Sequence, residues 1–185
     1  MSAVLQIANE QTVERQLLIR RLRQSRDCFV GSLADVPEEL CRVRPSDDRW
    51  STIDCVEHIV IAENAWHVRL QGRQPVIEPI DRAMDEFVNR VAERTEKRSA
   101  PERAQPKGKY ATLAEAAQEF RAARERTIAF AEHTNEDFRA FSVEHALGVL
   151  DIHQFLLLAA AHAECHAKQI EEIKASAAYR AALKK

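Results

Sequence analysis

The sequence predicts an all-α protein, a four-helix bundle in which a long connection crosses over between the second and third helices. Only four Gly and six Pro occur among 185 residues, and these are the residues that most disfavour a helix interior. Four long segments carry apolar residues at the spacing of a helical face. The connection from Gln71 to Tyr110 is long enough to cross the whole bundle, so we expect a crossover instead of a simple up-down-up-down order.

The first helix is expected from roughly Thr12 to Leu33, followed by a turn-rich connection with Pro37 and Pro45. One face of this helix is apolar, with Val13, Leu17, Leu22, Phe29, Val30 and Leu33 on it. A short extra helix is expected inside the long connection, around Ala83, Met84, Phe87, Val88 and Val91.

The second helix has a clear beginning and a clear end. Ser51 is a good N-cap, and Asp54 three residues later makes a variant of the capping box. Trp50 precedes the cap, where its ring can pack onto the first turn near Cys55. The helix is expected to end near Gly72.

Capping residues also mark the third and fourth helices. Thr112 opens a capping box, T-L-A-E, and the third helix is expected to run to about His133. Residues 138–150 are expected to form a loop, and Asp151 then caps the fourth helix. We expect one domain, residues 1–185, in which roughly the last ten residues, after Ser176, are frayed.

Charge and composition exclude several classes of function. The formal net charge of −2 gives no global field that favours nucleic acid or anionic lipid. The N-terminus lacks the features of a signal peptide, and the longest apolar stretch, residues 155–161, is too short to span a bilayer. We therefore expect a cytoplasmic protein with no membrane or nucleic-acid partner. Its four cysteines show no C-x-x-C spacing, so reduced and mostly buried thiols are expected.

Histidines supply the candidate site. His162 and His166 are four residues apart, so their rings emerge about 40° apart on one face of the fourth helix. That face also carries apolar residues, and two buried imidazoles need partners. His58 lies on the apolar stripe of the second helix and should also face the core. We predict that these three histidines bind one divalent metal ion, although a buried histidine can also simply form a hydrogen bond with a neighbour.

Other metal sites fit the sequence less well. A zinc metalloprotease has its glutamate directly after the first histidine of HExxH, whereas Glu164 comes two residues after His162. We expect Glu164 to be a solvated surface residue. A di-iron bundle needs an ExxH pair on each of two helices, and neither histidine-bearing helix has one. The histidine in the loop before the fourth helix, His145, is a further candidate to approach the site.

The remaining histidines and cysteines are expected outside the ligand set. His67 and His153 each lie nine residues from a predicted ligand, which turns them to the opposite helix face. His133 near the end of the third helix can interact with the helix dipole. Cys165 lies off the ligand face, so we expect it to be buried packing, while Cys55 is close enough in sequence to line a cavity.

Two longer motifs resemble a known family. The first is R-W-S-T-I-D-C-V-E-H-I-V-I-A-E, from Arg49 to Glu63. The second is H-A-L-G from His145, followed by L-D-I-H-Q-F-L-L-L-A-A-A-H-A-E-C-H-A-K-Q-I, and the loop Q-P-K-G-K-Y-A-T-L-A-E-A also fits. Together they resemble the DinB-like family (the damage-inducible protein B superfamily), which is related to thiol transferases. The similarity extends from about Leu33 to Lys174.

The resemblance implies a fold and a ligand set. It implies a four-helix bundle with a long link between the second and third helices, and a homodimer. It also implies one divalent transition metal ion, zinc or nickel, on His58, His162 and His166, with water completing the coordination. The family usually has Pro where this chain has Ala146, so the shape of that loop is expected to differ.

Three hypotheses for the function follow. Three neutral ligands leave an open metal position, which is typical of catalytic sites. With the resemblance, this favours a metal-dependent transferase that joins a low-molecular-weight thiol to an electrophile, or a metal-dependent hydrolase. No general base is identified, because Glu57 and Glu63 are expected to be solvated charges on a helix face. The alternative is a non-catalytic, stress-related metal-binding or interaction module. The third hypothesis is a plain bundle whose three histidines never meet.

Overall fold

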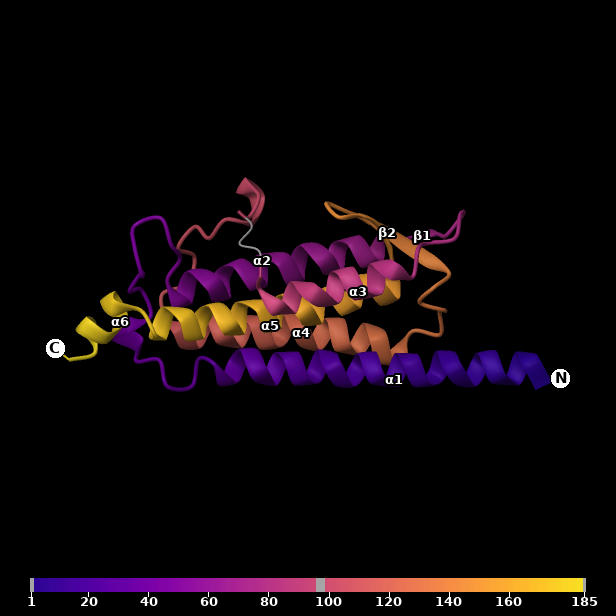
Figure 1. Ribbon diagram of the computed structural model, residues 1–185, viewed down its shortest axis with the longest axis horizontal. Helices are drawn as coiled ribbons and strands as arrows, with labels where there is room; N and C mark the ends of the chain where they lie inside the picture. Colours follow the sequence, from indigo (N-terminus) through magenta and orange to yellow (C-terminus); the bar gives the residue numbers. More distant parts are fainter. Residues whose placement is uncertain (1, 96–98, 185) are drawn as a thin grey trace.

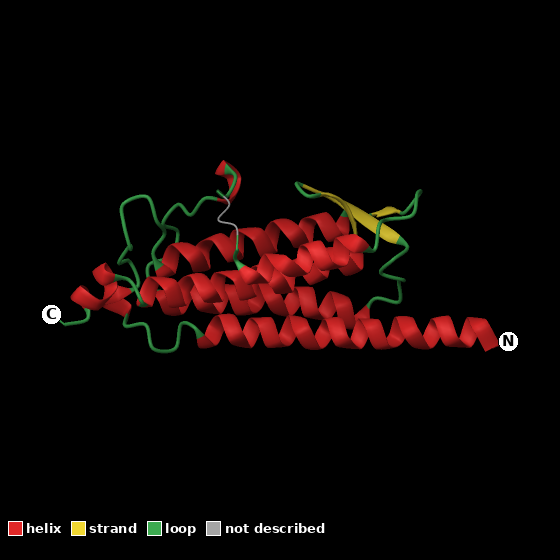
Figure 2. Cartoon of the chain, in the orientation of Figure 1, coloured by secondary structure: helices red, strands yellow, loops and turns green. Residues whose placement is uncertain are grey.

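The chain folds into an elongated helical bundle with a small sheet at one end (Figures 1 and 2). A computed structural model describes residues 2–95 and 99–184, with side chains from residue 11 onward. The four long helices are α1 (Ser2–Gly31), α2 (Thr52–Gln71), α4 (Leu113–His133) and α5 (Ile152–Lys174). The predicted four-helix bundle is therefore confirmed. None of the described helices combines the length and the apolar character that crossing a membrane requires.

The connection between α2 and α4 crosses the length of the bundle, as predicted. It contains the short helix α3 (Ala83–Asn89), and it returns the chain to the end of the bundle where α2 began (Figure 1). As a result α2 and α4 run in the same direction, and α5 runs antiparallel to both (Figure 1). This arrangement places α2 beside α5, the two helices that carry the predicted ligands.

Capping fixes where the ligand-bearing helices begin. The Ser51 hydroxyl accepts the N–H of Asp54 at 3.4 Å, and the Asp54 carboxylate accepts the N–H of Ser51 at 3.0 Å, so the predicted capping box is present. Asp151 caps α5 in the same reciprocal way with Gln154. In α4, Thr112 accepts the N–H of Glu115, but the glutamate carboxylate accepts the N–H of Ala111 and not that of the cap itself.

Residues 138–150 do not form the expected loop. They contain β2 (Phe141–His145), which pairs antiparallel with β3 (Gly148–Asp151), while β1 (Gln74–Pro75) pairs with the other edge of β2. Val143 and Leu150 are paired in register and both are buried. A four- or five-residue strand with one inward apolar residue gives too little alternation to predict a strand from the sequence.

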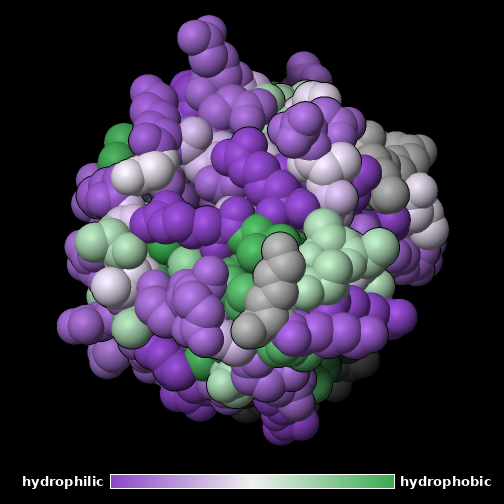
Figure 3. Space-filling model, turned by 90° about the vertical axis from the view of Figure 1, so that its left-hand side faces the viewer, coloured by the Kyte–Doolittle hydropathy of each residue, from purple (hydrophilic) through white to green (hydrophobic). Residues whose placement is uncertain are grey.

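The chain ends also differ from the expectation. Helix α1 begins at Ser2, ten residues before the predicted start, and extends past the other helices (Figure 1). The tail does not fray within the described residues, because a short helix α6 (Ala177–Ala182) follows α5. The Ser176 hydroxyl caps α6, and Tyr179 packs into the core with 4% of its surface exposed. That end of the bundle is largely hydrophilic around a small apolar area (Figure 3).

A buried ion pair joins all four long helices. Arg124 of α4 is fully buried and donates to the Glu63 carboxylate of α2 at 2.6 Å and to the Ser25 hydroxyl of α1 at 2.7 Å. It also donates to the carbonyl of Ala159 in α5 at 2.8 Å. Glu63 is 2% exposed, so our expectation of a solvated charge was wrong. Its partner lies 61 residues away, beyond the range of local sequence patterns.

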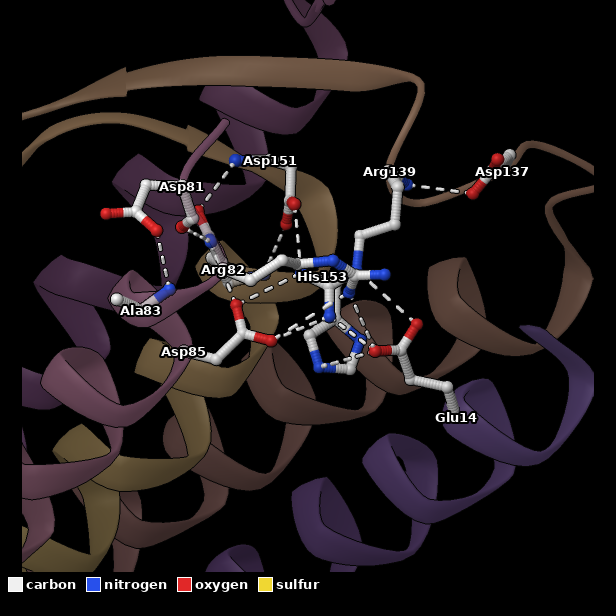
Figure 4. A network of polar contacts seen from close by, with 10 residues as sticks. Glu14, Asp81, Arg82, Ala83, Asp85, Asp137, Arg139, Asp151 and His153 are labelled. Atoms are coloured by element: carbon white, nitrogen blue, oxygen red, sulfur yellow. Dashed lines mark hydrogen bonds and ion pairs between the residues drawn. The ribbon is translucent and has the colours of Figure 1, made fainter. Parts of the chain in front are cut away.

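A second polar network ties the sheet end together (Figure 4). The Arg139 guanidinium, between α4 and β2, donates to Asp85 of α3 at 2.8 Å, to Asp151 at the start of α5 at 2.9 Å, and to Glu14 of α1. Burial alone would raise the pKa of Glu14 and Asp85, but hydrogen bonds from Arg139 hold both pKa values below their usual range. One cation therefore ties together three carboxylates, from α1, α3 and the start of α5.

Candidate metal centre

The three predicted histidines come together in the structure. His58 lies in the second turn of α2, and His162 and His166 lie one turn apart on α5. The Nε2 atom of His162 is 3.3 Å from that of His58 and 3.2 Å from that of His166. The ligand atoms of all three lie within 4.8 Å of one another. The plain-bundle hypothesis, in which these side chains never meet, is therefore wrong.

The nitrogen spacing fits one tetrahedral metal ion. Zinc–imidazole bonds of about 2.0–2.1 Å in a tetrahedron separate neighbouring nitrogen atoms by about 3.3–3.4 Å. The two measured separations, 3.3 and 3.2 Å, agree with that value. Neutral imidazoles within reach of one another are a donor set that zinc, nickel, copper and iron accept. The residues present therefore fit a divalent transition metal ion.

Hydrogen bonding fixes the tautomer of His58. Its Nδ1 atom lies 2.7 Å from the carbonyl oxygen of Ala104, in a 3₁₀ turn (Glu102–Ala104) of the crossover connection. A carbonyl oxygen only accepts, so Nδ1 carries the proton and Nε2 keeps its lone pair for a metal. His166 Nδ1 is buried without a well-formed hydrogen bond, with the Gln169 side chain beside the ring.

The electrostatic setting keeps all three histidines neutral. Desolvation is the largest cause that lowers the pKa of His58, His162 and His166. The pKa of His162 is lowered further by the charges that His166, His58 and Arg124 would place beside it. A metal binds the unprotonated imidazole, so the burial that disfavours protonation favours metal capture.

Two tryptophans enclose the three rings. The Trp50 ring lies 4.7 Å from that of His58 and 6.2 Å from that of His166 between centroids. Trp66 lies 5.2 Å from His162. His58 and His166 are only 6% and 7% exposed, whereas His162 is partly exposed. The role of Trp50 as a wall of the site was not evident from its place before the helix cap.

His145 approaches the site without joining the ligand set. It ends β2, and its ring lies 6.2 Å from Trp66 and 6.1 Å from Phe155. Its Nδ1 accepts the N–H of Leu147 at 3.2 Å, so Nε2 carries the proton. Burial, with smaller contributions from Arg69 and Arg103, lowers the pKa of His145 to about 4. His145 is therefore a neutral N–H donor beside the tryptophan wall.

Glu57, next to His58 in α2, is a residue that sequence reasoning placed wrongly. It was expected in solvent, but it is 3% exposed. Its carboxylate accepts three backbone N–H groups of the crossover connection, from Lys107 at 2.7 Å, Gly108 at 2.9 Å and Lys109 at 3.1 Å. No local sequence pattern predicts this contact, because the partners of Glu57 lie about fifty residues further along the chain.

The other candidates lie away from the metal centre. Glu164 forms an ion pair with Arg21 of α1 at 3.0 Å, so it is bound to a neighbouring helix and not simply solvated. All four cysteines are free: Cys28 is exposed and the other three are buried. Burial raises the pKa of Cys55 and of Cys165, which disfavours a reactive thiolate at either position.

A second group of possible ligands is already occupied by protein. Ligand atoms of Glu14, Asp85 and His153 lie within 4.8 Å of one another near the sheet (Figure 4). Arg139 donates to both carboxylates, and Gln154 donates to Asp85 as well. A cation is thus part of this group, which makes it a structural network and leaves the three histidines as the candidate metal centre.

Comparisons with known proteins agree with this picture. A sequence profile of the DinB superfamily matches residues 21–170. No curated protein matches the sequence. The fold is similar to that of YfiT from Bacillus subtilis, with a TM-score of 0.57 and 15% identity over 87% of this chain and 86% of that chain. YfiT is described as a probable metal-dependent hydrolase with an unusual four-helix bundle topology.

Proposed function

We propose that this chain, which belongs to the DinB superfamily, is a metal-dependent enzyme that holds one divalent ion on His58, His162 and His166. The observation that carries the proposal is that the Nε2 atom of His162 lies 3.3 and 3.2 Å from those of His58 and His166, separations that fit a tetrahedral site. The description of YfiT as a probable metal-dependent hydrolase supports the same class of chemistry.

The reaction we propose is either thiol transfer to an electrophile or hydrolysis, with a small thiol or water as the nucleophile. When bound, the divalent ion would act as a Lewis acid and lower the pKa of that nucleophile. Three protein ligands leave a fourth position open. We propose that a small molecule approaches it from the side of His162, because this is the one residue of the three that is partly exposed. We propose zinc or nickel as the metal and the cytoplasm as the compartment.

Each surrounding residue has a part in this proposal. Trp50 and Trp66 limit the access of water to the ligand face. His145 is neutral and offers an Nε2–H donor beside Trp66, and we propose that this donor holds a polar group of a substrate. The three ligands are kept unprotonated by burial, so no base is needed to release their lone pairs.

A second candidate is a non-catalytic metal-binding module. It is favoured by the near-complete burial of His58 and His166 beneath Trp50, because a sealed ion can stabilise a core without meeting a substrate. The two candidates differ at the fourth metal position. An enzyme must admit small molecules there, a thiol for thiol transfer or water for hydrolysis, whereas a sealed module does not.

Metal content tests the proposal directly. Untagged protein should contain about one equivalent of zinc or nickel by elemental analysis, and His58→Ala and His162→Ala should lose it. His133→Ala is the matched control, because that exposed histidine on α4 lies outside the three-histidine group. Protein that contains no metal and takes up neither added zinc nor nickel would refute the site.

Cobalt-substituted protein then separates the enzyme from the module. A small thiol that reaches the fourth position should add a sulfur-to-cobalt charge-transfer band in the near ultraviolet. If titration with 2-mercaptoethanol gives the band, screens for thiol transfer and hydrolysis follow. Bound cobalt whose spectrum ignores thiols and other small ligands would favour the sealed module.

A further inference from the structure

The crossover connection forms a clamped strap over the metal-binding end of α2. Residues 104–113 follow a 3₁₀ turn and lead into α4. Arg42 donates to the carbonyl groups of Tyr110 and Ala111 at 2.8 and 3.0 Å. The Glu38 carboxylate accepts the N–H of Leu113 at 2.7 Å. These contacts hold the end of the strap, and Glu57 holds its middle.

Glu57 and His58 are consecutive in α2 and bind two parts of the same strap. Glu57 Oε1 accepts the N–H of Lys107, and Oε2 accepts those of Gly108 and Lys109. Three residues before this clamp, the strap presents the Ala104 carbonyl that accepts the Nδ1–H of His58. The carboxylate therefore fixes the segment whose carbonyl fixes the imidazole.

Gly108 makes the clamp possible through its backbone. Its φ of +73° is a left-handed conformation that side-chain-bearing residues rarely adopt. In this conformation the N–H groups of Gly108 and Lys109 both reach Glu57 Oε2. A Cβ added at Gly108 would meet nothing within 4 Å, so only its conformation, and not its size, requires glycine.

We propose that Glu57 is a positioning residue of the metal centre. By clamping the strap, Glu57 holds His58 in the tautomer that directs the Nε2 lone pair at the metal. Glu57 touches no ligand atom; it acts through Lys107–Lys109 and the Ala104 carbonyl. Without the clamp, the carbonyl leaves Nδ1, and His58 divides between two tautomers and two ring orientations. Partners of this kind behind metal ligands contribute about 10- to 100-fold to metal affinity.

The consequence for metal affinity rests on the proposed function, whereas the tautomer of His58 can be measured without any metal. Glu57→Gln is the direct variant, since the amide keeps the size of the carboxylate but turns one acceptor into a donor. That donor would face N–H groups of the strap. We expect zinc affinity, measured by competition with a chelator at constant pH, to fall about 10- to 100-fold.

Nitrogen NMR of ¹⁵N-histidine-labelled, metal-free protein provides the readout that a merely structural role would not change. Wild type should show His58 as the single Nδ1–H tautomer, assigned by loss of its signals in His58→Ala. Glu57→Gln should show averaged nitrogen shifts for His58, with faster hydrogen exchange at the amides of Lys107–Lys109.

Asp151→Asn is the matched control for loss of stability. Asp151 is 2% exposed and also accepts a backbone N–H, but it caps the sheet end of α5, far from the strap. It should lower stability and leave both zinc affinity and the His58 tautomer unchanged. If Glu57→Gln does not fold, Gly108→Ala decides, because it strains the strap without altering α2; its zinc affinity should fall in the same direction.

Two results would overturn the proposal. One is a folded Glu57→Gln or Gly108→Ala protein that binds zinc as tightly as wild type. The other is a His58 that keeps the Nδ1–H tautomer in the metal-free variants. If wild type itself binds no zinc, the proposed function fails, but the tautomer and the exchange rates still decide whether Glu57 positions His58.

Discussion

The buried pair of Arg124 and Glu63 allows the sharpest test of how the bundle is held together. Arg124→Met removes a fully buried cation and leaves a carboxylate that is 2% exposed without its partner. Removing one member of such a pair costs about 3–5 kcal/mol. For a chain of this length, about 4 kcal/mol corresponds to a fall in melting temperature of about 8–16 °C.

A double variant that removes both charges should recover most of the stability that Arg124→Met loses. Replacing both Arg124 and Glu63 by Met leaves no buried charge, and such replacements are often neutral or stabilising by about 1–4 kcal/mol. The Ser25 hydroxyl retains the Leu22 carbonyl at 3.0 Å, so it is not left without a partner. We therefore expect the free energy of unfolding of the double variant to exceed that of Arg124→Met by at least about 3 kcal/mol and to be close to that of wild type.

Urea denaturation followed by circular dichroism measures the free energies of unfolding of wild type, Arg124→Met and the double variant. Arg23→Met is the matched control, because Arg23 also pairs with α4, through Glu132, but its side chain is 54% exposed. That change should cost no more than about 1 kcal/mol. The reasoning fails if Arg124→Met costs as little as the control, or if the double variant is no more stable than the single one.

Three further predictions concern pH and the tail of the chain. Burial lowers the pKa of all three ligand histidines. Zinc affinity should therefore stay constant as the pH falls through the ordinary histidine pKa of 6.5, and should decrease only at lower pH. Chelator competition from pH 8 to 5 measures the affinity, and a steep loss between pH 7 and 6 would contradict the prediction. The lowered pKa values of Glu14 and Asp85 stabilise the native state above their unfolded pKa values near 4, and this stability is lost as the pH falls through the folded values. Arg139→Leu should lower the free energy of unfolding by about 2 kcal/mol at pH 7. Part of this loss should be regained as the pH approaches 4, because Glu14 and Asp85, buried without their cation, then bind protons more tightly than in the unfolded chain. Urea titrations at both pH values check the direction of this change, and a variant that loses stability on acidification as wild type does would refute it. Tyr179→Ala should destabilise by about 3 kcal/mol because the ring is buried; a loss under about 0.5 kcal/mol in the same assay would show that the tail is frayed after all.

Local signals in the sequence predicted most of the helical frame. Ser51 with Asp54 marked the start of α2, and Asp151 marked the start of α5, because each cap bonds to groups within three residues. The two histidines of α5 were predicted as a pair for the same reason, since one helical turn fixes their relation. The long connection predicted the crossover because its length alone excludes a tight hairpin.

The two misplaced glutamates share a physical cause. Glu57 and Glu63 were assigned to solvent because a carboxylate in an isolated helix belongs there. Their partners, a strap of backbone N–H groups and a buried arginine, lie 50 or more residues further along the chain. The hairpin of residues 141–151 was missed for a different reason: its pairing is local, but its strands are too short to show a period of two.

The same contrast explains how the candidate site is built. The ligands follow from helix periodicity, since α2 supplies one imidazole and α5 supplies two on a single face. The orientation of the His58 lone pair does not follow from periodicity. It depends on the Ala104 carbonyl, which accepts the Nδ1–H of His58 and belongs to a strap that Glu57 and the left-handed Gly108 hold in place. A chain with the same three histidines but without this carboxylate and glycine would keep the ligand set and lose the orientation of one ligand. The histidine pattern therefore indicates where a metal can bind, and the strap contacts determine how tightly.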